Sequence, residues 1–291
     1  MAGDYNEIKK MKYLNLGCAY TYSTGKEWIN LDFISTGADV IAHDLLNGIP
    51  FENNSFDLVY HSHVLEHFSK EDGEKIIAEC FRVLKPGGII RIAIPDLEMI
   101  LRNYLRYLEQ GLNSPNDETI RYNYDWMMIE MYDQAVRNHS GGNMQKYLFN
   151  ENLKNEDFIF ERIGEEGRAL RRNYFAIKEN LSTINNNTII KKSSEKLIPK
   201  IKRSIKKYLI KKLKIDEGAM AIGRFRLNGE IHQWMYDRYS LTALLIKNGA
   251  KSIQIRDAFT SFINNWANYD LDGKNGIVRK PDSLFVEAIK K

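Results

Sequence analysis

Short apolar segments recur through the first 95 residues, with polar connections between them. A helix is predicted at Lys70–Leu84, because its apolar residues recur at three- and four-residue spacing and the sequence "KPGG" follows it. Strands separated by such connections predict a parallel sheet that is covered on both faces. The predicted strands are Tyr13–Leu16, Trp28–Leu31, Val40–Ala42, Leu58–Tyr60 and Ile89–Ile94.

The pattern changes after these strands and returns near the end of the chain. Residues 96–230 contain long helical stretches such as "LEMILRNYLRYLEQ" and "YDWMMIEMYDQAV". From residue 231 a predicted helix, "HQWMYDRYSLTALLIKNGA", precedes two predicted strands, "SIQIRDA" and "SLFVEAIKK". We therefore predict an α/β core of residues 1–95 and 231–291, with 96–230 as a helical insertion that forms a substrate lid. The expected fold is Rossmann-like, a seven-stranded, mainly parallel sheet with an antiparallel C-terminal strand.

The composition is that of a soluble globular protein, with 43% hydrophobic and 27% charged residues among 291. The first residues lack the apolar region of a secretory signal, and no apolar run has the ~18 residues of a spanning helix. Cys18 and Cys80 lie in apolar segments, which predicts reduced, buried thiols in a cytoplasmic protein. Two cysteines without a paired motif disfavour a zinc site.

One segment is strongly basic. Residues 191–214 hold eleven Lys and Arg residues and one acid, so the net charge of +4 leaves −6 on the remainder. Within residues 196–213 the apolar residues recur at helical spacing opposite the lysines, which predicts an amphipathic helix. Three interpretations remain: packing on the domain, peripheral contact with an anionic membrane, and nucleic-acid binding, which is the least favoured.

The stretch "YLNLGCAYTYSTGKEWINLD" combines a loop glycine, Gly17, with an acid, Asp32, at the end of the next strand. An acid in this place can accept hydrogen bonds from a ribose diol, but the G-x-G-x-x-G pattern of dinucleotide sites is missing. The stretch therefore disfavours a nicotinamide dehydrogenase and favours a cofactor with a ribose and no pyrophosphate. The alternative is a plain strand, turn and strand.

A second stretch, "HDLLNGIPFENNSFDLVYHSHVLEHF", also has polar side chains at the ends of predicted strands. Asp44 can accept from an adenine amine while Leu45 packs on the ring. The next predicted strand ends among polar side chains that packing alone does not explain: His61, His63, Glu66 and His67. A metal site formed by His61, His63 and His67 is a weaker alternative, and we predict no metal.

Taken as an ordered set, "LNLGC", "WINLD", "IPFENNSFDLVYHSHVLEHF" and "ECFRVLKPGGIIRIAIPD" resemble class I S-adenosylmethionine-dependent methyltransferases. The resemblance is to the small-molecule "methyltransferase type 11"-like group. The tracts "YDQAVRNHSGGNM" and "HQWMYDRYSL" further resemble a bacterial subgroup associated with polysaccharide biosynthesis. These resemblances imply an enzyme with S-adenosyl-L-methionine as cofactor. Its expected activity is O-methyl transfer to a sugar or other small polar acceptor in surface polysaccharide or capsule biosynthesis.

The resemblance also implies which residues contact the cofactor. Two positions depart from the family pattern: Ala19 replaces a common glycine, and Asn15 stands where an acid is frequent. An alanine can be accommodated at this position if its φ is negative. The implied cofactor residues are Leu16, Gly17, Cys18, Asp32, Phe33, Asp44, Leu45 and His61.

A hydroxyl acceptor needs a base, and histidine suits this role because its pKa lies near neutrality. The predicted catalytic residues are His63, which leads by its position after the strand, His67 and His232. The predicted substrate residues are Asp96, Arg137 and His139, with the alternatives that Asp96 caps a helix and that "SGG" at 140–142 is a turn.

Two other functions stay open. Ribose methylation of nucleic acid is one, although "HSHVLEH" lacks the Asn/Asp-Pro-Pro-aromatic clamp of enzymes that methylate base amines. A non-catalytic methyltransferase-like binding scaffold is the other, and the departures at Ala19 and Asn15 permit it.

Overall fold

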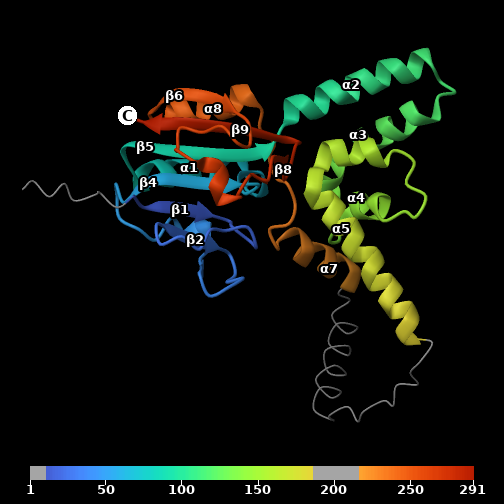
Figure 1. Ribbon diagram of the computed structural model, residues 1–291, viewed down its shortest axis with the longest axis horizontal. Coiled ribbons are helices and arrows are strands. Elements are labelled where there is room, and N and C mark those ends of the chain that lie inside the picture. Colours follow the sequence, from blue (N-terminus) through green and yellow to red (C-terminus); the bar gives the residue numbers. More distant parts are fainter. Residues whose placement is uncertain (1–10, 186–215) are drawn as a thin grey trace, which may run out of the picture.

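The computed structural model describes residues 11–185 and 216–291, so the basic segment of residues 191–214 lies outside the described part. A seven-stranded sheet runs through one half of the molecule, in the order β3-β2-β1-β4-β5-β9-β6, and helices form the other half (Figure 1). The strands are β1 Tyr13–Leu16, β2 Trp28–Asp32, β3 Val40–Ala42, β4 Phe56–Ser62, β5 Leu84–Pro95, β6 Ala250–Arg256 and β9 Ser283–Lys290.

The first five strands pair in parallel, and β9 is antiparallel to both of its neighbours, β5 and β6. This confirms the predicted fold, and the C-terminal strand lies inside the sheet. The chain moves outward from β1 through β2 to β3 and then returns to β4 on the other side of β1. Such a reversal of strand order opens a crevice at the carboxyl ends of β1 and β4.

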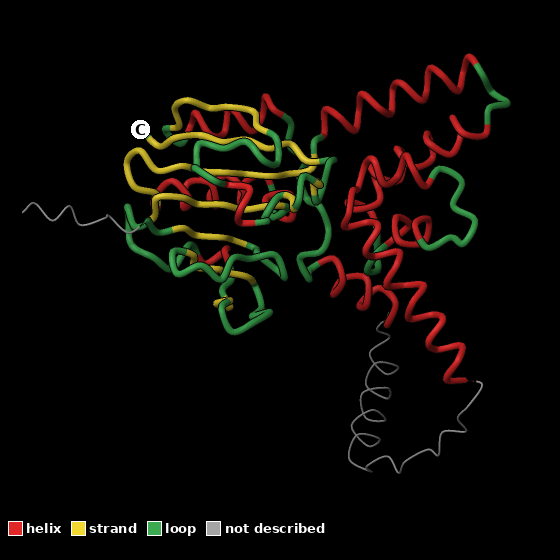
Figure 2. The backbone as a smooth tube through the Cα atoms, in the orientation of Figure 1, coloured by secondary structure: helices red, strands yellow, loops and turns green. Residues whose placement is uncertain are grey.

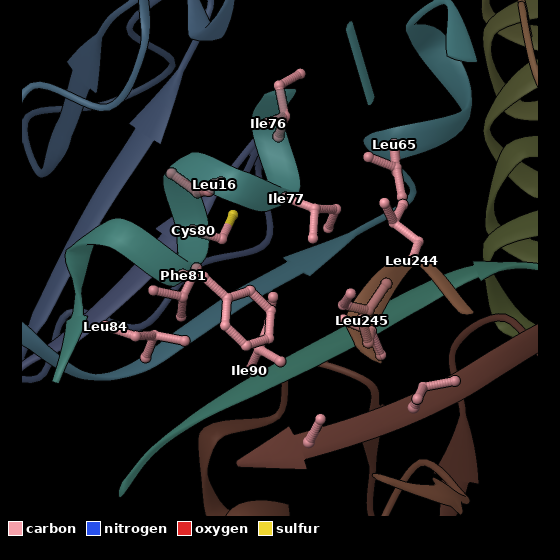
Figure 3. Packing of buried hydrophobic residues seen from close by; sticks show 14 of the residues in the cluster. Leu16, Leu65, Ile76, Ile77, Cys80, Phe81, Leu84, Ile90, Leu244 and Leu245 are labelled. Atoms are coloured by element: carbon pink, nitrogen blue, oxygen red, sulfur yellow. The ribbon is translucent and has the colours of Figure 1, made fainter. Parts of the chain in front are cut away.

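Two helices, α1 (Lys70–Val83) and α8 (Arg238–Lys247), cover one face of the sheet. Figure 3 shows Ile77, Cys80 and Leu245 packed against the strands in this core. Helix α8 begins later than predicted, because Asp237 caps it by accepting a hydrogen bond from the Ser240 backbone N–H at 2.7 Å. The segment of residues 232–237 before it is not helical, so that part of the prediction is wrong.

The other face of the sheet is covered by an irregular segment, residues 257–282. It contributes η3 (Trp266–Tyr269) and the hairpin of β7 (Gly273–Lys274) and β8 (Ile277–Val278). Trp266 packs with Tyr13, Trp28 and Tyr60 in an aromatic cluster. Both faces are therefore covered, as predicted, but among the described residues only one of them is covered by helices.

The helices between residues 97 and 185 share a hydrophobic core of their own, centred on the fully buried Trp126 and Met127. Figure 2 shows the helical part of the molecule beside the sheet, and the arrows of the parallel strands in Figure 1 point toward it. None of the helices in the described ranges has the length and apolar character needed to cross a membrane. The helices of this part are α2 Leu97–Asn113, α3 Glu118–Val136, α4 Gly142–Leu148, α5 Glu156–Asn185 and α7 Glu217–Arg226.

Candidate functional site

A cavity of about 780 Å³ opens at the carboxyl ends of β1 and β4, where the strand order reverses. Gly17, Cys18 and His63 line it from the sheet side. The β7–β8 hairpin and the middle of α5 line it from the other side. A volume of this size is typical of small-molecule and cofactor sites.

Gly17 is the residue that makes this cavity possible. Its φ is +62°, a conformation that glycine adopts without strain, and a Cβ at this position would overlap a methyl group of Val64. The loop after β1 therefore approaches the loop after β4 more closely than any other residue would allow. Beside it, burial and the nearby Asp32 raise the pKa of the Cys18 thiol to about 12, so the thiol stays protonated at neutral pH.

Ala19 has a φ of +44°, so the negative φ that would accommodate an alanine easily is not observed. The Asp32 carboxylate explains the conformation, because its Oδ2 accepts a hydrogen bond from the Ala19 backbone N–H at 2.8 Å. This contact ties the loop after β1 to the end of β2. Asp32 is half-buried at the end of the strand, as predicted, and in this structure it holds the loop.

Of the predicted cofactor residues, Gly17 and Cys18 line this cavity, and Asp32, Leu16, Phe33, Asp44, Leu45 and His61 do not. The Leu16 side chain is part of the core, and Phe33 is 68% exposed. Asp44 accepts from the Leu46 N–H at 2.9 Å and caps the short helix η1 (Leu45–Asn47). His61 is buried inside the sheet layer with neither ring nitrogen bonded to the described residues, and burial lowers its pKa to about 4. Their roles remain predictions.

A second cavity, of about 420 Å³, lies between the ends of β4 and β5 and the helical part. All three predicted catalytic histidines, His63, His67 and His232, line it. His67 lies in the short helix η2 (Leu65–His67), and His232 comes from the segment before α8. The two cavities adjoin at residues that line both: His63, Glu166, Leu170 and Lys280.

His63 is held at this junction from two sides. Its Nε2 lies 2.7 Å from Ser283 Oγ at the start of β9, and its Nδ1 lies 3.2 Å from Glu66 Oε1. Its φ is +54°, a left-handed conformation that is uncommon for histidine. Strained residues of this kind persist where the surroundings fix them, and they are concentrated at functional sites.

Glu66 lies among the three histidines and is 1% exposed. Burial alone would raise the pKa of its carboxyl group, but His63, His232 and His67 outweigh burial and lower the pKa to about 2. Burial lowers the pKa of His232 to about 3. At neutral pH the cluster therefore contains a carboxylate beside a neutral imidazole. The rings of His67 and His232 meet edge to face, with centroids 4.9 Å apart.

The predicted substrate residues are dispersed. Asp96 caps α2 by accepting from the Met99 N–H at 3.1 Å, and burial raises its pKa. Arg137 lines the smaller cavity and pairs with Glu230 at 3.1 Å. His139 is exposed and does not line the cavity. For Asp96 the capping alternative is observed, and a contact with substrate remains a prediction for all three.

The glycines of "SGG" form a turn. Gly141 and Gly142 have φ values of +76° and +52°. A Cβ on Gly142 would overlap the Asp133 carboxylate, which accepts from the Asn143 N–H at 2.7 Å and caps α4. The turn alternative is thus observed, and the two glycines orient the chain where Arg137 enters the cavity.

Helix α5 supplies cavity residues that the sequence analysis missed, namely Glu166 and Leu170. A kink at Gly164 (φ +63°) brings α5 against residues 279–281, and Glu166 pairs with Lys280 at 3.1 Å. The sequence feature that could have predicted this contact is Gly164 itself, because a glycine inside an otherwise helical pattern indicates close packing or a bend.

Residues 23–92 match the family described as "Methyltransferase domain". A probable S-adenosylmethionine-dependent methyltransferase of Mycolicibacterium smegmatis is 38% identical over 56 residues, which are 19% of this chain and 21% of that protein. The chain thus matches about a fifth of the length of this curated relative. The family match at residues 23–92 includes β2, β3, β4 and α1 and runs into β5.

Two solved structures of SAM-dependent methyltransferases are also similar. The one from Thermotoga maritima is 11% identical, with a TM-score of 0.37, and the match covers 96% of this chain and 82% of that one. The one from Archaeoglobus fulgidus is 12% identical, with a TM-score of 0.37, and the match covers 97% and 87%. At these TM-scores neither likeness supports a conclusion about this chain, whose fold follows from its own strand order.

Proposed function

We propose that this chain is an S-adenosylmethionine-dependent methyltransferase that transfers the methyl group to a hydroxyl of a small polar acceptor. One observation carries the proposal: two cavities of ligand size adjoin at the carboxyl ends of β1 and β4, and His63 lines both. The methyltransferase-domain match of residues 23–92 agrees with the larger cavity as the cofactor site. The smaller cavity is then the acceptor site.

The cofactor requires a ribose contact and a close backbone approach, and the residues present fit both needs. Gly17 gives the close approach, and Cys18 lines the same cavity. Asp32 has the position from which a carboxylate holds a ribose diol. When bound, S-adenosylmethionine supplies a methyl group on a positively charged sulfur, which reacts with a nucleophile once the two are aligned.

The residues of the smaller cavity align the acceptor and remove its proton. A carboxylate can only accept, so the 3.2 Å contact with Glu66 favours the His63 tautomer with hydrogen on Nδ1. The Nε2 lone pair is then free of hydrogen and faces the Ser283 hydroxyl at 2.7 Å. An acceptor hydroxyl in place of that of Ser283 gives its proton to Nε2 as its oxygen attacks the methyl group.

The acceptor class is part of the proposal. The smaller cavity is lined by Arg137, Glu230, Glu166 and Lys280 in addition to the histidines. Apolar side chains such as Trp126 and Phe149 line it as well, and a mixed lining of this kind suits a sugar, which has both hydroxyl groups and apolar ring faces. Together with the sequence tracts at residues 132–144 and 232–241, this supports a sugar acceptor in bacterial surface polysaccharide or capsule biosynthesis.

The test is a transfer assay with a methyl-labelled cofactor. The purified protein is incubated with sugar nucleotides, sugar phosphates and capsule fragments, and the label is followed by mass spectrometry. We expect label on a sugar oxygen. Label on RNA ribose and on none of these compounds would contradict the acceptor class, and no cofactor binding would contradict the enzyme assignment.

His63→Ala should lower kcat by about 100-fold or more, the usual contribution of a general base, with cofactor binding unchanged. His63→Asn is the matched variant, because asparagine tolerates a positive φ and cannot act as the base. Turnover and calorimetric cofactor affinity are measured for both variants. Wild-type turnover in His63→Asn would remove His63 as the base.

A further inference from the structure

The described residues contain one cluster of potential metal ligands. Glu66, His67 and His232 each offer one ligand atom, and these atoms all lie within 4.8 Å of one another. In a tetrahedral zinc site, neighbouring nitrogen and oxygen ligands are about 3.4 Å apart, given metal–ligand bonds of about 2.0–2.1 Å. Small side-chain rotations would therefore bring the three atoms into contact with one ion.

We propose that Glu66, His67 and His232 bind a divalent transition-metal ion, with zinc as the best match. Two imidazoles and one carboxylate form a ligand set that binds zinc with one position left open. The set differs from the sequence-based alternative, since it contains neither His61 nor His63, and Glu66 and His232 take their places.

The lack of a hydrogen-bond partner for the buried Glu66 carboxylate, within the described part of the chain, is a second, independent observation that supports the metal site. The Glu66 side chain is 1% exposed, it lines the smaller cavity, and neither carboxylate oxygen has a hydrogen-bond partner among the described residues. His63 Nδ1 lies 3.2 Å from Glu66 Oε1, but the geometry of this approach is not that of a hydrogen bond. Buried carboxylates are normally paired, hydrogen-bonded or bound to metal. A cation in the cluster would satisfy this one.

The orientation of His67 also fits a metal ligand. Its Nδ1 lies 3.2 Å from the Ile231 carbonyl oxygen, which can only accept, so Nδ1 carries the hydrogen. The Nε2 lone pair is therefore available. Histidines that bind metals usually donate the second ring N–H to a carbonyl or carboxylate in this way. The same backbone segment, residues 231–232, thus fixes His67 and supplies the third ligand.

The open coordination position would face the acceptor cavity of about 420 Å³. A role there rests on the proposed function: the ion would bind the acceptor oxygen and make its proton easier to remove by the adjacent His63. Binding of the ion itself does not depend on methyl transfer, so the two proposals can fail separately.

The test uses the full-length protein, freed of metal with a chelator and titrated with zinc chloride by calorimetry and elemental analysis. We expect one equivalent to bind, with nitrogen and oxygen ligands by X-ray absorption. Glu66→Gln and His232→Ala should each weaken binding by at least tenfold, and His139→Ala, which removes an exposed histidine outside the cavity, should not.

Three outcomes would overturn the site: no stoichiometric zinc in the wild-type protein, sulfur among its ligands, or wild-type affinity in both cluster variants. Glu66→Gln nearly preserves shape, so it keeps the test meaningful where His232→Ala fails to fold, as judged by circular dichroism. Cofactor affinity is measured in the same samples. Zinc binding without cofactor binding would contradict the proposed function and leave the metal site intact.

Discussion

Two residues beside the proposed reaction centre, Ala19 and His63, have left-handed backbone conformations. A hydrogen bond from the Ala19 N–H to Asp32 stabilises the conformation of Ala19. The His63 side chain contacts Glu66 and Ser283. For residues with a Cβ the left-handed conformation costs about 1–2 kcal/mol. The strain therefore lies in the two loops that follow β1 and β4 and meet at the larger cavity.

Ala19→Gly tests this strain directly. Glycine relieves the left-handed backbone but gains entropy in the unfolded chain, so we expect stability between unchanged and about 1 kcal/mol higher. Ala78→Gly is the matched control, because Ala78 is exposed inside α1 and its replacement should cost about 1 kcal/mol. Thermal melts compare the two, and an equal loss in both would contradict the strain at Ala19.

At this scale the sequence predicted that Gly17 follows the first strand and that Asp32 ends the second, and the structure confirms both positions, while their contact with a cofactor stays a prediction. It did not predict the φ of Ala19, because that conformation depends on where the Asp32 carboxylate lies after β1 and β2 pair. It also predicted the polar set after β4 but not the Ser283 contact of His63, which comes from the last strand.

Among the elements, α5 determines the shape of both cavities through its kink. At Gly164 an added Cβ would lie 2.6 Å from the Arg279 carbonyl oxygen and would overlap the ring of Pro281. The helix therefore touches residues 279–281 only because position 164 has no side chain. This contact places Glu166 and Leu170 where the cavities adjoin.

Gly164→Ala should lower stability by about 1–3 kcal/mol, the cost of a strained backbone that its surroundings enforce. Gly223→Ala in α7 is the control, since its Cβ would meet nothing within 4 Å and alanine favours a helix. We expect the first variant to melt earlier than wild type and the second at the same temperature or later. The reverse order would contradict the role of the kink.

The bounds of helices and strands were predictable where the local pattern of apolar residues determines them. The bounds of β1 and β3 agree with the prediction, and α1 agrees to one residue. The start of α8 was predicted too early. The helix-like sequence pattern begins before Asp237, but the helix itself begins only after this residue, which caps it. The hairpin of β7 and β8 was missed because its strands have two residues each, too few for any periodicity.

At the scale of the whole molecule, Arg91 joins the sheet to the segment that covers its second face. The side chain is fully buried and pairs with Asp272 at 2.7 Å and Glu287 at 2.9 Å. Asp272 in turn accepts from the Tyr60 hydroxyl at 2.6 Å. These contacts connect β4, β5, β9 and the loop before β7.

Arg91→Met should cost about 3–5 kcal/mol, because it leaves the Asp272 carboxylate buried without its cation and removes one of the two cations of Glu287, which keeps Arg256 at 3.2 Å. Arg102→Met removes an exposed cation that pairs with Glu98 and should melt close to wild type. Denaturant unfolding measures both. Near-equal stability of Arg91→Met and wild type would show that the network is not needed to hold the second face.

The meeting of His67 and His232 belongs to the same scale. No local pattern links them, because the whole helical part of the chain lies between them in sequence. The return of the chain to the sheet, with the Gln233 N–H bonded to the Glu66 carbonyl at 2.8 Å, brings them together. The sequence therefore predicted His67 and His232 as separate catalytic candidates. Their proximity follows only from the fold.

The central claim is that the crevice beside β1 and β4 binds S-adenosylmethionine, and a calorimetric titration tests it most directly. We predict one equivalent bound by the wild-type protein and loss of binding in Asp32→Ala, with a thermal melt to confirm that the variant is folded. The absence of binding in the folded wild-type protein would contradict the account, as would unchanged affinity in Asp32→Ala.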